Sequence, residues 1–288
     1  MTDRQIDKYG SGLTSASFSA MLELGRVLQS YKDSIVLVGG WVPYLLIRGN
    51  GRGTFDHIGS IDIDLAIDPK EIDARAYASI VELIEGRGYS QRLDRNGKPI
   101  RFSFTKEIIS PEDGKSYTIQ VDFLTYRGSQ GKRHRHRDVQ DDLPARVANG
   151  CELAFQHNTS IEIEGTLPDG AETRTKFKML DIPGCLGMKG ITLGERYKEK
   201  DAYDIYTVAT QCLEEPEAVA EEVKPFLGEE LMARGMGCIK EKYGTQRGEG
   251  PTWTALFMEP TDEEKRKRVQ AKVYVEMQKF IIALEPGH

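Results

Sequence analysis

The sequence lacks the features that mark membrane, repetitive and disulfide-rich proteins. No apolar run approaches the roughly 20 residues that span a bilayer. Residues 1–12 are polar and contain no apolar core of a secretory signal. We find no internal repeat and no low-complexity tract. Only four cysteines occur, Cys151, Cys185, Cys212 and Cys238, and no two form a C-x-x-C pair. We therefore expect a cytoplasmic protein without a membrane partner, whose thiols are reduced and mostly buried.

The composition is that of a folded chain with a sizeable core. Hydrophobic residues make up 39% of the 288 positions, and the chain contains 2 Trp, 12 Tyr and 10 Phe. The 45 acidic residues outnumber the 39 Lys and Arg, which gives a net charge of −6. A protein that coats DNA would normally be basic, so a basic groove would have to be local. The length allows one large or two ordinary domains.

The first part of the chain alternates between strand and helix patterns. Apolar residues at helical spacing predict a first helix, with Ser15 or Ser17 as its N-cap. Pro43 suits the first turn of a second helix. Helices are expected at residues 15–29, 41–47 and 70–86, and strands at 34–38, 60–67, 99–104, 116–124, 160–164 and 174–180. We interpret residues 1–180 as one α+β domain that contains a mixed sheet flanked by helices.

From about residue 181 only helical patterns follow. Helices are expected near residues 184–193, 198–212, 215–226, 228–242 and 262–284. The last begins with a capping box, Thr261 and Glu264, and carries one apolar stripe: Val269, Val273, Met277, Ile281 and Leu284. We interpret residues 181–288 as a C-terminal helical domain, in which this last helix serves packing or oligomer contacts.

Two acidic residues alternate with apolar ones in the strand at 60–67. Asp62 and Asp64 are two residues apart, so a strand directs both carboxylates to one face. Adjacent like charges are destabilising unless a cation neutralises them, and Mg²⁺ prefers carboxylates, water and phosphate oxygens. The alternative is a solvated strand face.

Other residues in the first part could complete a metal–nucleotide site. Asp122 lies in a second apolar strand and could add a third carboxylate. Gly39 and Gly40 lie at a strand-to-helix turn whose backbone N–H groups could hold phosphate, although such a pair is often only a turn. Ser60 lies on the face of Asp62 and could contribute its hydroxyl group. The order of these elements favours a site over the separate structural explanations.

At this point the chain resembles a known group of enzymes. Residues 36–40 followed by Ser60, Asp62 and Asp64 resemble the signature of the polymerase-β-like nucleotidyltransferase superfamily. The segment with Lys189, Arg196, Lys200, Asp201 and Asp204 is similar to the K…R…(K/R)DxxD motif of the AbiEii/AbiGii abortive-infection toxins, a group that includes the MenT-type toxins. The resemblance covers residues 34–210. The chain departs from it in a 21-residue separation of Gly40 and Asp62 and in Ile58, where an arginine often stands.

The resemblance implies a nucleotidyltransferase fold and an enzyme that moves a nucleoside monophosphate from a nucleoside triphosphate to an acceptor. Asp62, Asp64 and Asp122 would hold two Mg²⁺ or Mn²⁺ ions. Gly39, Gly40 and Ser60 would contact the triphosphate. Lys189 and Lys200 would bind it too, oriented by Asp201 and Asp204, with Lys189 and Asp204 counted among the catalytic residues. Without the resemblance, Lys200, Asp201 and Asp204 would be interpreted as a surface salt-bridge ladder.

The resemblance also implies an acceptor and a partner. The acceptor would be the 3′ end of tRNA or another RNA, and the protein would be the toxin of a toxin–antitoxin pair with an antitoxin protein as partner. Alternatives are transfer to a small molecule such as an aminoglycoside, transfer to a protein hydroxyl, and a non-catalytic nucleotide-binding scaffold.

Two further features allow more than one interpretation. Residues 132–137 are six consecutive basic or imidazole side chains, which suit a solvated loop or a contact to nucleic acid or phosphate. Metal binding by His134 and His136 is the least favoured reading. Trp41 could stack on a base, but a place in the core is favoured.

Overall fold

The computed structural model describes residues 6, 9–50, 55, 57–72, 79–128 and 135–285. Contacts between Cα atoms divide the chain into two compact units. One, the sheet unit, comprises Gly10–Trp41 and Ser60–Leu180; the other, the helical unit, comprises Met1–Tyr9, Val42–Gly59 and Asp181–His288. The sequence placed residues 42–59 with the first domain, whereas these contacts group them with the C-terminal helices.

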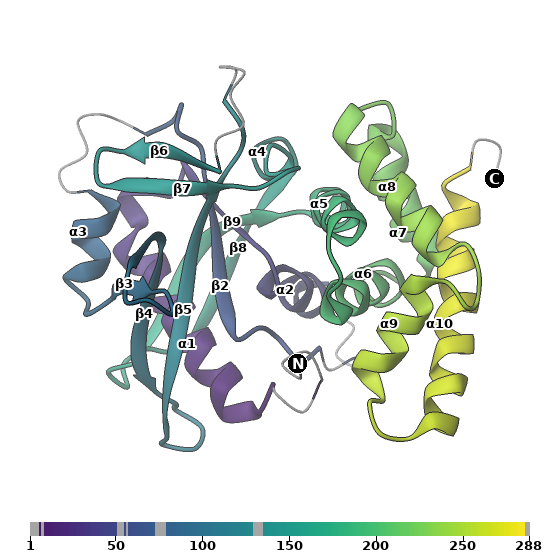
Figure 1. Ribbon diagram of the computed structural model, residues 1–288, viewed down its shortest axis with the longest axis horizontal. Helices are drawn as coiled ribbons and strands as arrows, with labels where there is room; N and C mark the ends of the chain where they lie inside the picture. The colour runs from purple at the N-terminus through teal and green to yellow at the C-terminus, as the bar shows by residue number, and fades with distance from the viewer. Residues whose placement is uncertain are drawn as a thin grey trace. The chain divides into compact units, whose positions relative to one another are not determined.

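The sheet unit contains a nine-stranded mixed sheet, which confirms the expected fold class (Figure 1). The strand order is β3-β4-β5-β2-β1-β9-β8, and β7 pairs with both β5 and β6. Pairs β1–β9, β2–β5 and β5–β7 are parallel and the others are antiparallel. The strands are β1 (Ile35–Val38), β2 (Asp62–Ile67), β3 (Ser90–Leu93), β4 (Pro99–Ile109), β5 (Ser116–Thr125), β6 (His136–Gln140), β7 (Leu143–Val147), β8 (Asn158–Thr166) and β9 (Glu172–Leu180).

Burial explains why the central strands form. All four residues of β1 are buried, as a strand covered on both faces requires. In β2, Ile63 and Leu65 are fully buried, whereas Asp62 and Asp64 on the opposite face are half-buried. The alternation seen in the sequence is therefore a division between a core face and a polar face.

In its described residues, the sheet unit also contains three helices and a short 3₁₀ turn. The helices are α1 (Ser11–Val27), α3 (Ile80–Glu85) and α4 (Leu153–Gln156), and the turn is η2 (Gln29–Tyr31). Helix α1 packs against β9, β8 and β5 through buried residues that include Ala20, Met21 and Leu24. Gly10, not Ser15 or Ser17, is its N-cap. Ser17 is instead fully buried and accepts a hydrogen bond from the Trp41 indole at 3.1 Å.

Helix α3 is shorter than the sequence predicted. A capping box of Ser79 and Glu82 starts it, and residues 73–78 of the expected helix lie outside the described part of the chain. The Ile80 amide also donates to Gln140 in β6, so the β6–β7 hairpin lies beside this helix (Figure 1). The sequence did not predict β3, β6, β7 or α4.

The helical unit contains helix α2 (Trp41–Gly49) from Val42 onward and the helices that follow residue 181. These are α5 (Ile182–Glu195), α6 (Glu199–Gln211), α7 (Pro216–Val223), the 3₁₀ turn η3 (Lys224–Phe226), α8 (Glu230–Tyr243), α9 (Glu249–Met258) and α10 (Glu263–Ala283). The sequence missed α9. Asp262, whose side chain accepts from the Lys265 amide, caps α10 in place of the predicted box of Thr261 and Glu264.

Glycines bring α5 and α8 into backbone contact. A β-carbon on Gly190 would overlap the carbonyl oxygen of Gly235, and one on Gly235 would overlap that of Gly187. The two helices therefore approach more closely than side chains allow. Helix α5 also carries Lys189, so this contact fixes the element that presents the lysine.

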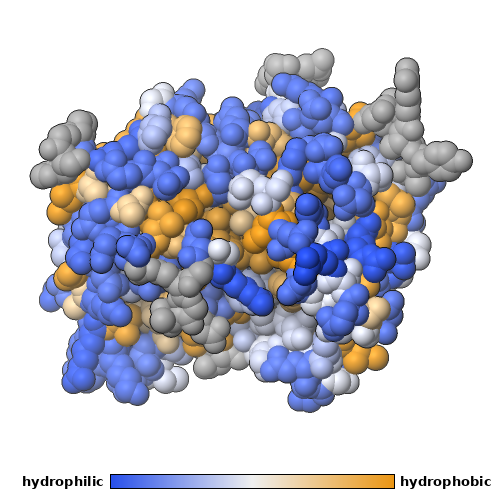
Figure 2. All heavy atoms as spheres, turned by 180° about the vertical axis from the view of Figure 1, so that it is seen from behind, coloured by the Kyte–Doolittle hydropathy of each residue, from blue (hydrophilic) through white to orange (hydrophobic). Residues whose placement is uncertain are grey.

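The burial of the cysteines and the hydrophilic character of the surface agree with what the composition predicts. Cys151, Cys185 and Cys212 are buried, Cys238 is half-buried, and none forms a disulfide with another described cysteine. Hydrophilic side chains cover much of the face in Figure 2, as 29% charged residues lead one to expect. None of the described helices combines the length and the apolar character needed to cross a membrane.

Candidate functional site

The structure brings the three predicted carboxylates onto one face of the sheet. Asp64 in β2 is the direct register partner of Asp122 in the parallel strand β5, and Asp62 is paired with Gln120. Side chains in register on neighbouring strands point to the same side, and the strands lie about 4.8 Å apart. All three carboxylates are half-buried. We call Asp62, Asp64 and Asp122 the acidic face.

Hydroxyl and amide groups orient two of these carboxylates. Ser60 Oγ donates to Asp62 Oδ1 at 2.9 Å, as its predicted position suggested. Ser103 Oγ in β4 donates to Asp122 Oδ1 at 2.5 Å, and Gln120 Nε2 donates to the same oxygen at 2.9 Å. Among the described residues, none donates to the Oδ2 oxygens of Asp62 and Asp122.

Ser103 and Arg92 are site residues that the sequence reasoning missed. Arg92 Nε in β3 donates to Ser103 Oγ at 2.9 Å, so the serine hydroxyl is held between the guanidinium and Asp122. Ser103 is fully buried and is the register partner of Asp122 across the antiparallel β4–β5 pair. In the sequence, Ser103 stands out only as a polar residue between Phe102 and Phe104. Its contact with Asp122 follows from the pairing register of β4 and β5, which the sequence does not show.

Gly39 packs directly on the acidic face. Its φ of +75° is a conformation that favours glycine, and a β-carbon there would overlap Asp64 Oδ2. Glycine is therefore required at this position for two reasons: the turn needs a positive φ, and any side chain would overlap the Asp64 carboxylate. Gly40, also half-buried, is the last residue before α2. Its contact with phosphate stays a prediction.

The carboxylate oxygens of the acidic face suit a hard cation, but the described residues form no complete set of ligands around one. Within the described ranges, no three His, Cys, Asp or Glu side chains gather so that they could hold a metal ion. Mg²⁺ in phosphate-transfer sites uses one or two carboxylates and takes its other ligands from water and substrate phosphates. The paired Asp64 and Asp122 and the adjacent Asp62 fit that pattern. The three-carboxylate, two-ion site stays a prediction.

The second predicted motif forms a buried charge network in the helical unit. Lys189 Nζ in α5 bonds Asp204 Oδ2 at 2.6 Å and Asp201 Oδ1 at 3.2 Å. Lys200 Nζ bonds Asp204 Oδ1 at 2.9 Å, and Arg196 bonds Asp201 Oδ2 at 2.9 Å. The lysines and aspartates are each less than a tenth exposed. The alternative of a surface salt-bridge ladder is therefore wrong, because these side chains lie in the interior.

The network favours the charged forms of Asp204 and Lys189. Burial raises the pKa of Asp204, but Lys189 and Lys200 outweigh it and hold that pKa well below its usual range. Burial likewise lowers the pKa of Lys189, yet Asp204 and Asp201 raise it above its ordinary value. For Lys200, burial prevails over the attraction of Asp204, so its pKa is lowered. Lys200 is the less firmly held of the two ammonium groups.

His57 joins this network, and the sequence reasoning did not single it out. Its Nδ1 accepts a hydrogen bond from the Gly59 amide at 3.1 Å, and its Nε2 lies 3.1 Å from Asp204 Oδ1. Burial lowers the pKa of His57 to about 4, so the ring is neutral at pH 7. A neutral ring that accepts at Nδ1 carries its proton on Nε2 and donates it to Asp204.

The buried part of the network is balanced in charge. Lys189 and Lys200 face Asp201 and Asp204 in the interior, His57 is neutral, and the side chain of Arg196, which adds a positive charge, is 48% exposed. Roles for Lys189 and Lys200 in triphosphate binding, and for Asp201 and Asp204 in orienting them, stay predictions.

Two other predicted features have separate outcomes. Trp41 is buried, 1% exposed, and packs near Phe18 in the sheet unit, so its expected core role is confirmed. Of the basic stretch, residues 132–134, and His134 with them, lie outside the described part of the chain. Arg135 precedes β6, and His136 and Arg137 form its first residues, so this end of the stretch is a strand and not a loop.

Comparisons with known proteins give limited results. No protein-family model matches the chain. No curated protein matches it either. The fold is similar to a solved structure, described as an antigenic nucleotidyltransferase-like protein from Paracoccidioides brasiliensis, with 14% sequence identity and a TM-score of 0.44. The aligned region covers 80% of this chain and 89% of that one. The narrower resemblance to the AbiEii/AbiGii toxins stays a prediction.

Proposed function

We propose that the protein is a nucleotidyltransferase whose chemistry takes place at the acidic face. The observation that carries the proposal is the register of β2 and β5, which places Asp64 beside Asp122 with Asp62 on the same side. Three carboxylates on one polar face repel one another and gain from a cation. A structural role alone does not explain why glycine backbone and oriented hydroxyls surround them.

Each side chain of the face has a distinct role in this proposal. Asp62 and Asp64 would hold a divalent metal, Mg²⁺ or Mn²⁺, which when bound neutralises triphosphate charge. Asp122, oriented by Ser103 and Gln120, accepts the proton of the acceptor hydroxyl. The hydroxyl oxygen forms a bond to the α-phosphorus, and the bond from that phosphorus to the oxygen of the β-phosphate breaks. Pyrophosphate leaves, so no covalent enzyme intermediate is needed.

The proposed acceptor and biological role follow the resemblance. The acceptor is the 3′ end of tRNA or another RNA, and the protein is the toxin of a toxin–antitoxin or abortive-infection pair with a protein antitoxin. Lys189 and Lys200, held by Asp201 and Asp204, are proposed contacts of the triphosphate.

Labelled nucleotides test the reaction directly. The protein is incubated with α-³²P-labelled nucleoside triphosphates, Mg²⁺ and total RNA, and both labelled RNA and released pyrophosphate are measured. We expect label in the tRNA fraction and equal amounts of pyrophosphate. Pyrophosphate with unlabelled RNA would shift the acceptor to a small molecule or a protein. Nucleotide binding without pyrophosphate release would contradict transfer.

Single substitutions then locate the chemistry. We expect Asp64→Asn and Asp122→Asn each to lower the rate by about 100-fold or more. Melting temperatures should stay equal or rise, because removing one of several crowded carboxylates relieves repulsion. Asp33→Asn, an exposed aspartate paired with Lys178, is the control and should keep full activity. Activity within a few-fold of wild type in both site variants would refute the assignment.

A further inference from the structure

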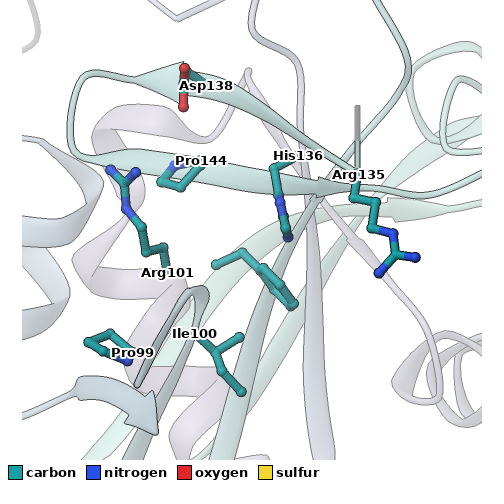
Figure 3. Close-up of a pocket in the computed structure, with 8 residues that line it drawn as sticks. Pro99, Ile100, Arg101, Arg135, His136, Asp138 and Pro144 are labelled. Atoms are coloured by element: carbon teal, nitrogen blue, oxygen red, sulfur yellow. The ribbon is translucent and has the colours of Figure 1, made fainter. Parts of the chain in front are cut away.

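An open groove of about 540 Å³ lies in the sheet unit, against β4, β6 and β7. Its walls include Arg101 and Phe102 from β4 and Arg135, His136 and Asp138 from or next to β6 (Figure 3). In Figure 3, Arg101 and Arg135 lie on opposite sides of His136. The groove therefore combines cationic side chains at its two ends with a ring between them.

The middle of the groove is a flat, stacked surface. The rings of Phe102 and His136 are stacked, with centroids 5.3 Å apart and planes at 29°. The guanidinium carbon of Arg146 in β7 lies 5.6 Å from the Phe102 centroid. The ring of His136 is exposed, and Phe102, on which it stacks, is half-buried, so both side chains reach the surface. Stacked aromatic surfaces of this kind bind the faces of nucleobases.

Arg101 and Arg135, which line the groove, and the neighbouring Arg146 have no acidic partner among the described residues. In the described ranges, neither Arg101, Arg135 nor Arg146 forms an ion pair, although the chain carries more acidic than basic residues. Of the described residues that line the groove, Asp138 is the acidic one. The Nε of Arg146 is buried and bonds no described residue, which is an unusual cost for a charged group.

We propose that this groove binds a single-stranded polynucleotide. One base stacks on His136, and the phosphates on its 5′ and 3′ sides contact Arg101 and Arg135. A mononucleotide carries phosphate on one side of its sugar and reaches one of these arginines, whereas a strand reaches both. Inorganic phosphate would leave the stacked rings unused.

Strand register relates Arg146, which lies over the ring of Phe102, to the acidic face. Arg146 is the register partner of Leu124 in β5, and Leu124 lies two residues after Asp122. Arg146 and Asp122 are thus on the same side of the sheet. Binding itself does not depend on transfer chemistry, so this inference stands apart from the proposed function.

Fluorescence anisotropy with a labelled single-stranded RNA of about ten nucleotides tests the proposal. The measurement is made on the full chain over a range of salt concentrations, without triphosphate and with EDTA present. We expect the double variant Arg101→Gln/Arg135→Gln to bind more weakly and to lower the slope of log affinity against log salt by about 1.4, since each phosphate contact to a single strand contributes about 0.7.

A matched control and a stacking variant sharpen the test. Arg174→Gln/Lys176→Gln removes the same charge from exposed, ion-paired positions on β9 of the same unit and should change neither quantity. His136→Ala should weaken binding roughly tenfold through lost stacking. A DNA strand of the same sequence shows which of the two polynucleotides the groove prefers.

Three outcomes would overturn the proposal. In the first, the arginine double variant keeps wild-type affinity and salt slope. In the second, the β9 control loses as much affinity as the arginine double variant does. In the third, a nucleoside monophosphate competes for the protein as well as the unlabelled strand does. The variant Asp64→Asn separates the two hypotheses, because it should lose transfer and keep strand binding. Loss of transfer in the arginine variant with normal binding would refute the groove and leave the acidic face intact.

Discussion

Removal of the Asp204 carboxylate is the sharpest test of the buried network. Asp204 is 1% exposed and accepts hydrogen bonds from Lys189, Lys200 and His57. In Asp204→Asn, the two buried lysines keep only the carboxylate of Asp201 as a counter-charge in the interior. Breaking a buried ion pair by removing one partner costs about 3–5 kcal/mol. We expect a loss of unfolding free energy in that range at about pH 7.

The pH dependence of that loss identifies its cause. In wild type, Asp204 and Asp201 outweigh burial and hold the pKa of Lys189 above its ordinary value, and without Asp204 burial should bring that pKa below it. Between that lowered pKa and the ordinary lysine value of about 10.4, the unfolded chain binds more protons than the folded one, so stability rises with pH. The difference between variant and wild type should therefore shrink as the pH rises from about 7 to about 10.

Urea unfolding at the two pH values, followed by circular dichroism, measures both effects. Glu221→Gln is the control in the same unit, because Glu221 pairs with Lys224 but is 65% exposed. We expect this control to change stability by less than about 1 kcal/mol. A loss below about 1 kcal/mol in Asp204→Asn, or a difference that widens with pH, would refute the charged buried network.

Three further predictions concern other positions. Burial lowers the pKa of His57 to about 4, so the unfolded chain takes up this proton before the folded one does. The unfolding free energy of wild type should therefore fall by up to about 3 kcal/mol as the pH drops from about 6.5 to 4. In urea titrations, His57→Gln should reduce this dependence of stability on pH. Gly39→Ala should destabilise the fold by about 1–3 kcal/mol and impair transfer, because the backbone there has a positive φ and a β-carbon would overlap the Asp64 carboxylate. A variant with normal melting temperature and normal rate would contradict this. Gly190→Ala should destabilise by about 2 kcal/mol or more, whereas Gly237→Ala on the open side of α8 should be neutral or stabilising; equal melting temperatures would show that α5 and α8 are not in tight contact.

Local sequence patterns predicted the elements that carry the acidic face. The buried run at β1, the alternation around Asp62 and Asp64, and the apolar strand with Asp122 are all signals within a few residues. These signals predict strands because successive side chains of a strand point to opposite faces, so apolar residues alternate with polar ones where one face is core and the other is polar. The mixed sheet and the helical second part followed from the same reasoning.

The residues that complete each site could not be predicted, because they depend on pairing between distant segments. Ser103 reaches Asp122 only through the β4–β5 register, and Arg92 reaches Ser103 across another strand pair. His57 lies in a glycine-rich stretch with no periodic pattern, yet contacts a residue 147 positions later. The N-cap of α1 was misassigned for a related reason, since Ser17 is used by the core and not by the helix end.

The glycine contact between α5 and α8 has a consequence for how this protein tolerates change. Where two helices rest main chain against main chain, their spacing is set by atoms that every amino acid shares. Apolar neighbours can then be exchanged for others of similar volume while the helix that bears Lys189 keeps its position. A library that randomises the apolar residues around this crossing should therefore yield many folded members, provided that both helices keep their glycines.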